Sequence, residues 1–261
     1  MKPIISIPFF LILLFCAEPV LSADLQKGVE AYRNNEYKLA KHEFEPLANE
    51  GDANAQFFMG LLAELGRGGD NDLKSTQSDS DAVAWYTLAA KQQHAQAQLE
   101  LAKMYEYGLG IEQNDRIALH WYDSAAHLGK ATAQYKLAMM YSLGQGTPKD
   151  IQMAIEWFEK AGYRNNSSAF VELGYLYALG TDVQEDELAA LKAFRQAAAL
   201  KNAYGQFTMG REFFSGTVFP NDNSQALKWF NRAAQQGDLE AIRQLGFMYQ
   251  HGLYVSAWSW C

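Results

Sequence analysis

Apolar and small side chains recur along this chain with a period of 36 residues. Three columns of equivalent positions hold alanine, then tyrosine or phenylalanine four residues later, then alanine after three more. This spacing lies along one face of an α-helix, so each unit is predicted to contain one amphipathic helix. The columns are Ala82, Ala118, Ala154, Ala190 and Ala226; Tyr86, Tyr122, Phe158, Phe194 and Phe230; and Ala89, Ala125, Ala161, Ala197 and Ala233.

A second set of columns with the same period predicts another helix in each unit. In the unit that begins at Leu101, these columns hold Ala102, Tyr105 and Gly108. The alanine or glycine after the leucine leaves room for a close crossing of two helices. The glycine column is suited to ending the helix in a left-handed conformation. Its members are Gly108, Gly144, Gly180, Gly216 and Gly252.

Polar residues with short side chains stand four positions before the alanine column, where they are predicted to cap the second helix of each unit. Each unit is therefore a helix, a glycine-containing loop, a capped helix and a short turn, and the chain is predicted to be all-α. The predicted caps are Ser78, Asn114, Asp150, Asp186 and Asp222.

The repeats divide the chain into four parts: residues 1–23, a hairpin resembling a tetratricopeptide repeat at 24–50, the main array at 53–252 and a tail at 253–261. One step of the array is 42 residues, which we attribute to a polar loop insertion at residues 68–80. The array is predicted to hold five hairpins and a lone final helix, at 53–92, 95–128, 131–163, 167–200, 203–236 and 239–251. In the final helix, Leu245, Gly246 and Tyr249 are expected to pack inward.

The segment LAKMYEYGLGIEQNDRIALHWYDSAA, residues 101–126, resembles the Sel1-like repeat, a relative of the tetratricopeptide repeat. The resemblance implies a right-handed α-solenoid of stacked helix-turn-helix repeats with a concave inner face. Bacterial members of the family are mostly exported or envelope proteins and resemble adaptors, so the resemblance also implies an adaptor role. This chain departs from the pattern at Ala102 and Ala138 (in place of the first glycine), at Asp182, Val218 and Tyr254 (second loop glycine) and at Ala193 (tryptophan).

The first 23 residues have the pattern of a secretory signal peptide. Lys2 precedes an apolar run at residues 4–15, and small residues follow at Ser22 and Ala23. We expect a periplasmic or secreted protein without a membrane span after cleavage; the alternative is an uncleaved anchor. Cleavage would leave Cys261 as the one cysteine, so no intrachain disulfide is expected.

Composition and motifs provide no sign of catalysis. The net charge of −8 argues against binding to nucleic acid or to an anionic membrane surface. The segment that starts at His42 resembles a zincin motif, but Pro46 stands where the second histidine is needed. We expect no catalytic, cofactor-binding or metal-binding residues and no enzyme activity. The histidines (His42, His94, His120, His127 and His251) are predicted to lie on the surface, and the tryptophans in column (Trp85, Trp121, Trp157 and Trp229) in the core.

The concave face of the solenoid is the expected binding surface, lined by the first helix of each pair. The favoured function is an exported scaffold of the bacterial cell envelope that binds a peptide or protein. The alternatives are a glycan- or polysaccharide-binding repeat protein and, less favoured, a cell-wall hydrolase. The candidate partner-binding residues lie on first helices, outside the packing columns: Gln96, Lys103, Glu106, Tyr135, Met139, Tyr175, Tyr204, Phe207, Arg211 and Arg243.

The C-terminal end offers two interpretations, because no capped partner helix follows residue 251. Either Val255, Trp258 and Trp260 fold back over the apolar end of the solenoid, or two chains meet there as a homodimer. In the second case Cys261 could form an intermolecular disulfide in an oxidising compartment.

Export is expected to remove the N-terminal segment near Ala23, because the small residues there follow the apolar run. Mass spectrometry of the exported protein would then find a mature N-terminus close to this residue. A protein that keeps Met1 and stays in the cytoplasm would contradict the prediction.

Overall fold

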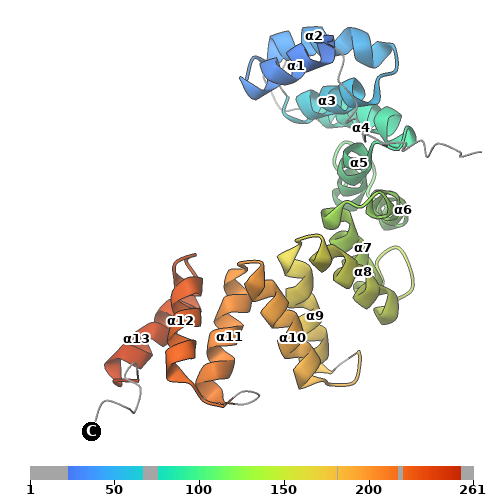
Figure 1. Cartoon of the computed structure of the whole chain (residues 1–261). Helices are drawn as coiled ribbons and strands as arrows, with labels where there is room; N and C mark the ends of the chain where they lie inside the picture. The colour runs from blue at the N-terminus through green and yellow to red at the C-terminus, as the bar shows by residue number, and fades with distance from the viewer. Residues whose placement is uncertain (1–22, 67–75, 181, 217–219, 254–261) are drawn as a thin grey trace, which may run out of the picture.

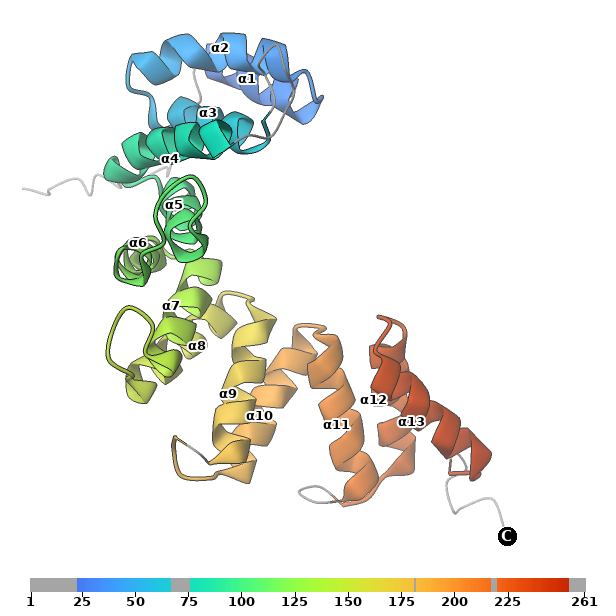
Figure 2. The same cartoon turned by 180° about the vertical axis from the view of Figure 1, so that it is seen from behind.

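The computed structural model describes residues 23–66, 76–180, 182–216 and 220–253. These ranges hold thirteen α-helices and no strand, and the helices follow one another along a single arc (Figures 1 and 2). The helices are α1 (Ala23–Arg33), α2 (Tyr37–Asn49), α3 (Ala53–Glu64), α4 (Thr76–Lys91), α5 (Ala95–Tyr107), α6 (Asp115–His127), α7 (Ala131–Leu143), α8 (Ile151–Tyr163), α9 (Ser167–Leu179), α10 (Glu187–Ala199), α11 (Ala203–Ser215), α12 (Asn223–Ala234) and α13 (Leu239–Gln250).

Each helix packs chiefly against its neighbours in the chain, so the core runs along the array as a series of connected clusters. The alanine and aromatic columns of the second helices are buried, with Tyr122 and its neighbours Ala118 and Ala125 fully enclosed. This arrangement confirms the predicted all-α solenoid of helix-turn-helix repeats.

The small residues of the first helices lie directly beneath the aromatic rings of the second helices. A Cβ atom added to Gly174 would come within 2.5 Å of the Phe194 ring, and one added to Gly210 within 2.6 Å of the Phe230 ring. These distances are shorter than contacts between real Cβ atoms and their neighbours, so the ring rests on the backbone of the first helix. The predicted close crossing is therefore present.

Four of the five predicted helix caps are confirmed. The side chains of Asn114, Asp150, Asp186 and Asp222 each accept a hydrogen bond from the backbone N–H three residues later, at 2.9–3.1 Å. The prediction for Ser78 is wrong, because α4 already begins at Thr76 and the Ser78 hydroxyl donates to the Ala63 carbonyl of α3.

The loop insertion expected at 68–80 is correspondingly shorter, since residues 76–80 are helical. Residues 67–75 lie outside the described residues. The glycines that were predicted to end first helices do so at Gly108, Gly144, Gly180 and Gly216, which adopt φ values of 62–73°.

The first helices also carry caps, which were not predicted from the sequence. Asp52, Asn166, Asn202 and Asp238 accept a hydrogen bond from the N–H three residues later. His94 does the same for α5, where its Nδ1 lies 3.1 Å from the Ala97 nitrogen.

The predicted surface position of His94 is wrong. Its ring stacks on Phe57 with 4.7 Å between ring centroids, and the residue is half-buried. Burial, and to a smaller extent the Lys130 charge, lowers the pKa of this imidazole below its ordinary value. The other four histidines are exposed, as predicted.

Buried glutamines join successive hairpins through hydrogen bonds that the sequence pattern did not reveal. The amides of Gln56, Gln98 and Gln134 donate to carbonyls eight residues earlier, near the end of the preceding second helix, at 3.0–3.1 Å. Each of these carbonyls lies in the last turn of its helix and also accepts a bond from the backbone N–H three residues later. The column therefore fixes one hairpin onto the next.

The tryptophans are less uniformly buried than the sequence predicts. Trp157 is 4% exposed and belongs to the core. Trp85, Trp121 and Trp229 are half-buried and pack against core clusters from the side.

The final helix, α13, packs inward only in part. Leu245 is buried against α12, as predicted. The prediction for Gly246 and Tyr249 is wrong, because both residues are exposed.

Tyr122→Ala is expected to lower the free energy of unfolding by about 3–5 kcal/mol, because it removes a fully buried aromatic side chain. His120→Ala, on the exposed side of the same helix, is expected to cost under about 0.5 kcal/mol. Urea unfolding of both variants measures the contrast. Similar losses for the two would mean that the helical phase is wrong.

Candidate functional site

In two of the hairpins, a tyrosine of the second helix forms a hydrogen bond with a glutamate of the first helix and fills the space between them at the surface. The Tyr86 hydroxyl donates to Glu64 at 2.8 Å, and the Tyr122 hydroxyl donates to Glu106. Lys136 of α7 contacts Glu106 at 2.8 Å as well. Burial, together with the nearby carboxylates, raises the pKa of both tyrosines far above the ordinary value.

The next three hairpins carry phenylalanine in the aromatic column, and the glutamate column changes with it. Its positions are Ser142, Ala178 and Phe214, so a ring hydroxyl occurs only where a carboxylate accepts from it. This coupling follows from the cost of burying a hydroxyl without a partner. Phe214 fills the position with a second ring, whereas Ser142 and Ala178 leave a hollow beside the phenylalanine.

The first hollow, of about 250 Å³, lies where α7, α8 and α9 meet. Its base includes Phe158, and an ion pair between Lys149 and Asp182, 2.6 Å long, borders it. Apolar side chains from α7 and α9 supply most of the remaining lining. The hollow is lined by Met139, Ser142, Leu143, Lys149, Phe158, Glu172, Tyr175, Leu176, Leu179 and Asp182.

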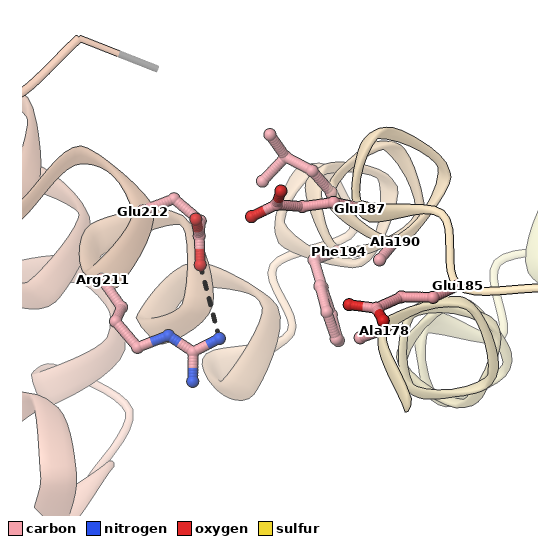
Figure 3. A pocket seen from close by; sticks show the side chains of 8 residues that line it. Ala178, Glu185, Glu187, Ala190, Phe194, Arg211 and Glu212 are labelled. Carbon is pink, nitrogen blue, oxygen red and sulfur yellow. Dashed lines mark hydrogen bonds and ion pairs between the residues drawn. The ribbon is translucent and has the colours of Figure 1, made fainter. Parts of the chain in front are cut away.

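The second hollow, of about 190 Å³, lies between α9, α10 and α11 (Figure 3). The Phe194 ring lies between the carboxylates of Glu185 and Glu187, with Arg211 and Glu212 on the facing helix (Figure 3). Arg211 pairs with Glu212 at 3.4 Å in an exposed position, a weak interaction in water. Three carboxylates against one guanidinium leave this hollow negatively charged.

The two hollows are one feature that occurs twice. Positions 142, 149, 158 and 175 of the first correspond, 36 residues later, to positions 178, 185, 194 and 211 of the second. Because the hairpins stack in register, the hollows lie in successive units of the solenoid. The first is mainly apolar and the second mainly acidic.

Aromatic side chains connect the hollows along the first helices. The ring centroids of Tyr175 and Tyr204 are 5.4 Å apart, and those of Tyr175 and Phe194 are 5.7 Å apart. Tyr204 in turn contacts Phe207, with 6.1 Å between centroids. Burial, followed by the hydrogen bond to Tyr204, raises the pKa of Tyr175 to about 12.

The structure brings six of the ten predicted binding residues together on α7, α9 and α11. Met139, Tyr175 and Arg211 line the hollows themselves. The other three members of this group contact neighbouring side chains of the same helices or of the core. They are Tyr135, Tyr204 and Phe207.

The remaining four predicted residues lie elsewhere. Gln96 and Lys103 both contact Glu100 on α5, at 2.7 and 2.8 Å. Glu106 is held by Tyr122 and Lys136, and it therefore joins three helices.

Arg243, the last of the four, pairs with Glu240 at 2.6 Å on α13, apart from the hollows.

Sequence reasoning missed the residues that shape the hollows, above all Ala178, Phe194 and Glu212. One signal in the sequence could have predicted them: where the aromatic column changes from tyrosine to phenylalanine, the glutamate column loses its glutamate.

Among the described residues, no three histidine, cysteine, aspartate or glutamate side chains come close enough together to hold a metal ion. No helix within the described ranges combines the length and the apolar character that crossing a membrane requires.

The stability of the fold is expected to depend on the ionisation of Glu172, which lines the first hollow. Burial raises the pKa of this carboxyl above 4.5, although a hydrogen bond from Tyr135 opposes the shift. The unfolded chain therefore releases this proton at a lower pH than the folded chain, and stability falls as the pH rises from 4.5 through the folded-state pKa.

Glutamine does not titrate, so Glu172→Gln removes this pH-dependent loss. As the pH rises from about 4 to about 7, the free energy of unfolding of the variant is therefore expected to increase relative to that of the parent. Urea unfolding of both proteins at the two pH values measures the gain. The same difference between variant and parent at both values would contradict the prediction.

Comparison with known proteins gives a consistent result. The chain is similar in structure to a protective antigen present in uropathogenic Escherichia coli strains that displays an SLR fold, with 29% identity and a TM-score of 0.73. This similarity covers 87% of the chain and 49% of the antigen, so the chain spans about half of the antigen's length. A Sel1 repeat protein from Oxalobacter formigenes has 27% identity and a TM-score of 0.73, over 89% of the chain and 91% of that protein. No curated protein matches the chain.

A family model gives the same answer for the sequence. The Sel1 repeat model matches residues 53–94, 95–130, 131–166, 169–202, 203–238 and 239–257. These matches cover well over half of the chain, and the chain therefore belongs to the Sel1 repeat family.

Proposed function

We propose that this chain is an exported scaffold that binds a peptide or an extended protein segment across α7, α9 and α11. Sel1 repeat proteins generally mediate protein–protein interactions. The observation that carries the proposal is the repeated hollow beside Phe158 and Phe194, since successive hollows suit successive side chains of one ligand. This face is then the concave binding surface expected from the sequence, and the site is periplasmic or extracellular.

The lining of the two hollows indicates the chemistry of the ligand. Met139, Leu176 and Leu179 favour an apolar side chain in the first hollow. Glu185, Glu187 and Glu212 favour a lysine or arginine side chain in the second. Tyr175, a residue that is 38% exposed, lies between them as a large and partly polar anchor of the kind enriched in binding hot spots. The proposed ligand therefore presents an apolar and a basic side chain to adjacent units.

The test fills the second hollow with a side chain that the fold already uses elsewhere. The substitution Ala178→Phe places there the ring that Phe214 supplies at the same column position one unit later, and it adds no charge. Peptides are first selected from a displayed library against the parent chain, and their affinities are then measured by fluorescence anisotropy. Filling the hollow is expected to weaken binding at least tenfold, or about 1.4 kcal/mol, at unchanged helicity.

The matched control is Lys228→Glu, which changes an exposed charge on α12 outside both hollows and is expected to leave the affinity of the peptides unchanged. Selected peptides that bind the filled variant as tightly as the parent would contradict the proposed site. Failure to select any peptide, combined with binding on a glycan array, would favour the polysaccharide-binding alternative.

A further inference from the structure

A third hollow, of about 550 Å³, lies where the end of α10 meets α11 and α12 (Figure 1). It shares no lining residue with the hollows beside Phe158 and Phe194. Its volume is within the range of about 300–1,000 Å³ that is typical of small-molecule sites. A tryptophan ring, two cations and three amides line it: Trp229, Lys201, Arg232, Gln206, Gln235 and Gln236.

The charge of this third hollow is opposite to that of the chain. Of the described residues that line it, Lys201 and Arg232 are cationic and none is acidic, whereas the chain has a net charge of −8. Both residues are exposed, and neither forms an ion pair with a carboxylate of the described part of the chain. The third hollow therefore favours a ligand that carries a negative charge.

The corresponding place two hairpins earlier is closed. Trp157, two periods of 36 residues before Trp229, is only 4% exposed. The His127 ring covers it edge-on, with 5.1 Å between ring centroids. In the unit of Trp229 the position of this histidine is taken by Ala199, and Trp229 is half-buried. The change from histidine to alanine therefore uncovers the tryptophan.

Two further replacements make the uncovered place polar. In the closed unit, the Arg164 guanidinium donates to the Gly129 carbonyl at 3.3 Å. The residues at the same two positions of the open unit are Gln236 and Lys201. Gln236 donates to the side chain of Gln206 instead, at 2.8 Å, and Lys201 brings an ammonium group to a position that has no side chain in the closed unit. Amides and a cation thus surround the tryptophan.

We propose that the third hollow binds a sugar that carries a carboxylate, as one unit of an acidic glycan. Trp229 offers an apolar surface to the C–H groups of a sugar ring. Arg232 and Lys201 pair with the carboxylate, and the amides of Gln235 and Gln236, which both donate and accept, bind hydroxyls.

This combination favours an acidic sugar over other anions. The side chain of an aspartate or glutamate would occupy the cations but leave the ring and the amides unused. Nucleic acids are bound by many cations along their phosphates, and the third hollow has two. The Arg232 guanidinium lies 4.6 Å from the centroid of the Trp229 ring, so the charged and apolar parts of the ligand would bind next to each other.

The test is calorimetric titration of the full chain with two acidic probes, the tetramers of galacturonate and of glucuronate. At least one tetramer is expected to bind. Its methyl ester, which keeps the sugar rings but removes the charge, is expected to bind at least tenfold more weakly, and so is tetraglutamate. No binding of either tetramer, or equal binding of the ester, would overturn the proposal. Equal or tighter binding of tetraglutamate would overturn the sugar assignment in favour of an acidic peptide.

The matched variants of the chain are Ala199→His and Ala84→His. The first restores the cover that His127 supplies to Trp157, at a position that is exposed. The second adds a histidine at an exposed position of α4, where His120 stands one unit later. At pH 8 an imidazole with an ordinary pKa of about 6.5 is neutral, so neither substitution adds charge. Ala199→His is expected to weaken binding of the tetramer at least tenfold, whereas Ala84→His leaves it within twofold. Equal binding to these two variants would overturn the proposal.

One further pair of measurements separates this site from the proposed peptide site. Ala178→Phe fills the second hollow and is expected to leave the affinity for the tetramer unchanged. Ala199→His is likewise expected to leave the affinities of the selected peptides unchanged. Loss of tetramer binding in Ala178→Phe would overturn the assignment of the sugar to the third hollow.

Discussion

The solenoid depends on the contact between an aromatic ring of each second helix and a small residue of the first helix. The Phe194 ring leaves no room for a side chain at Gly174, and the Phe230 ring leaves none at Gly210. Alanine takes the small position in two other units, at Ala102 and Ala138, where it is fully buried. Each contact sets the distance between two helices, and its repetition every 36 residues stacks the hairpins in register.

The aromatic ring of each second helix also determines where a hollow can form at the surface. The residue four positions after the small residue lies on the same face of the first helix, beside the edge of the ring. Glu64 and Glu106 close this space by accepting the hydroxyl of a tyrosine. Ser142 and Ala178 leave it open beside a phenylalanine. A hollow can therefore arise from a change in the glutamate column alone, while the contact between the aromatic ring and the small residue, which supports the fold, stays the same.

The helices, the buried columns and most caps were predictable because they recur with the period. What the sequence did not predict are contacts between side chains of different units. Glu106 is off the core columns, and the repeat pattern gave no sign that Tyr122 and Lys136 bind it within the fold. His94 stands in the same column as the caps Asp52, Asn166, Asn202 and Asp238, so its cap on α5 could have been predicted, whereas its stacking on Phe57 depends on a residue outside that column. The acidic second hollow depends on residues of three helices, which no single column contains.

Amide hydrogen exchange, with and without a selected peptide, tests most directly whether the open positions of this column form the binding surface. The account predicts slower exchange in α9 and α11 and at the start of α10, with little change in α3 and α4, where the Tyr86–Glu64 pair closes the surface. Protection confined to α3 and α4, or absent from α9, would contradict it.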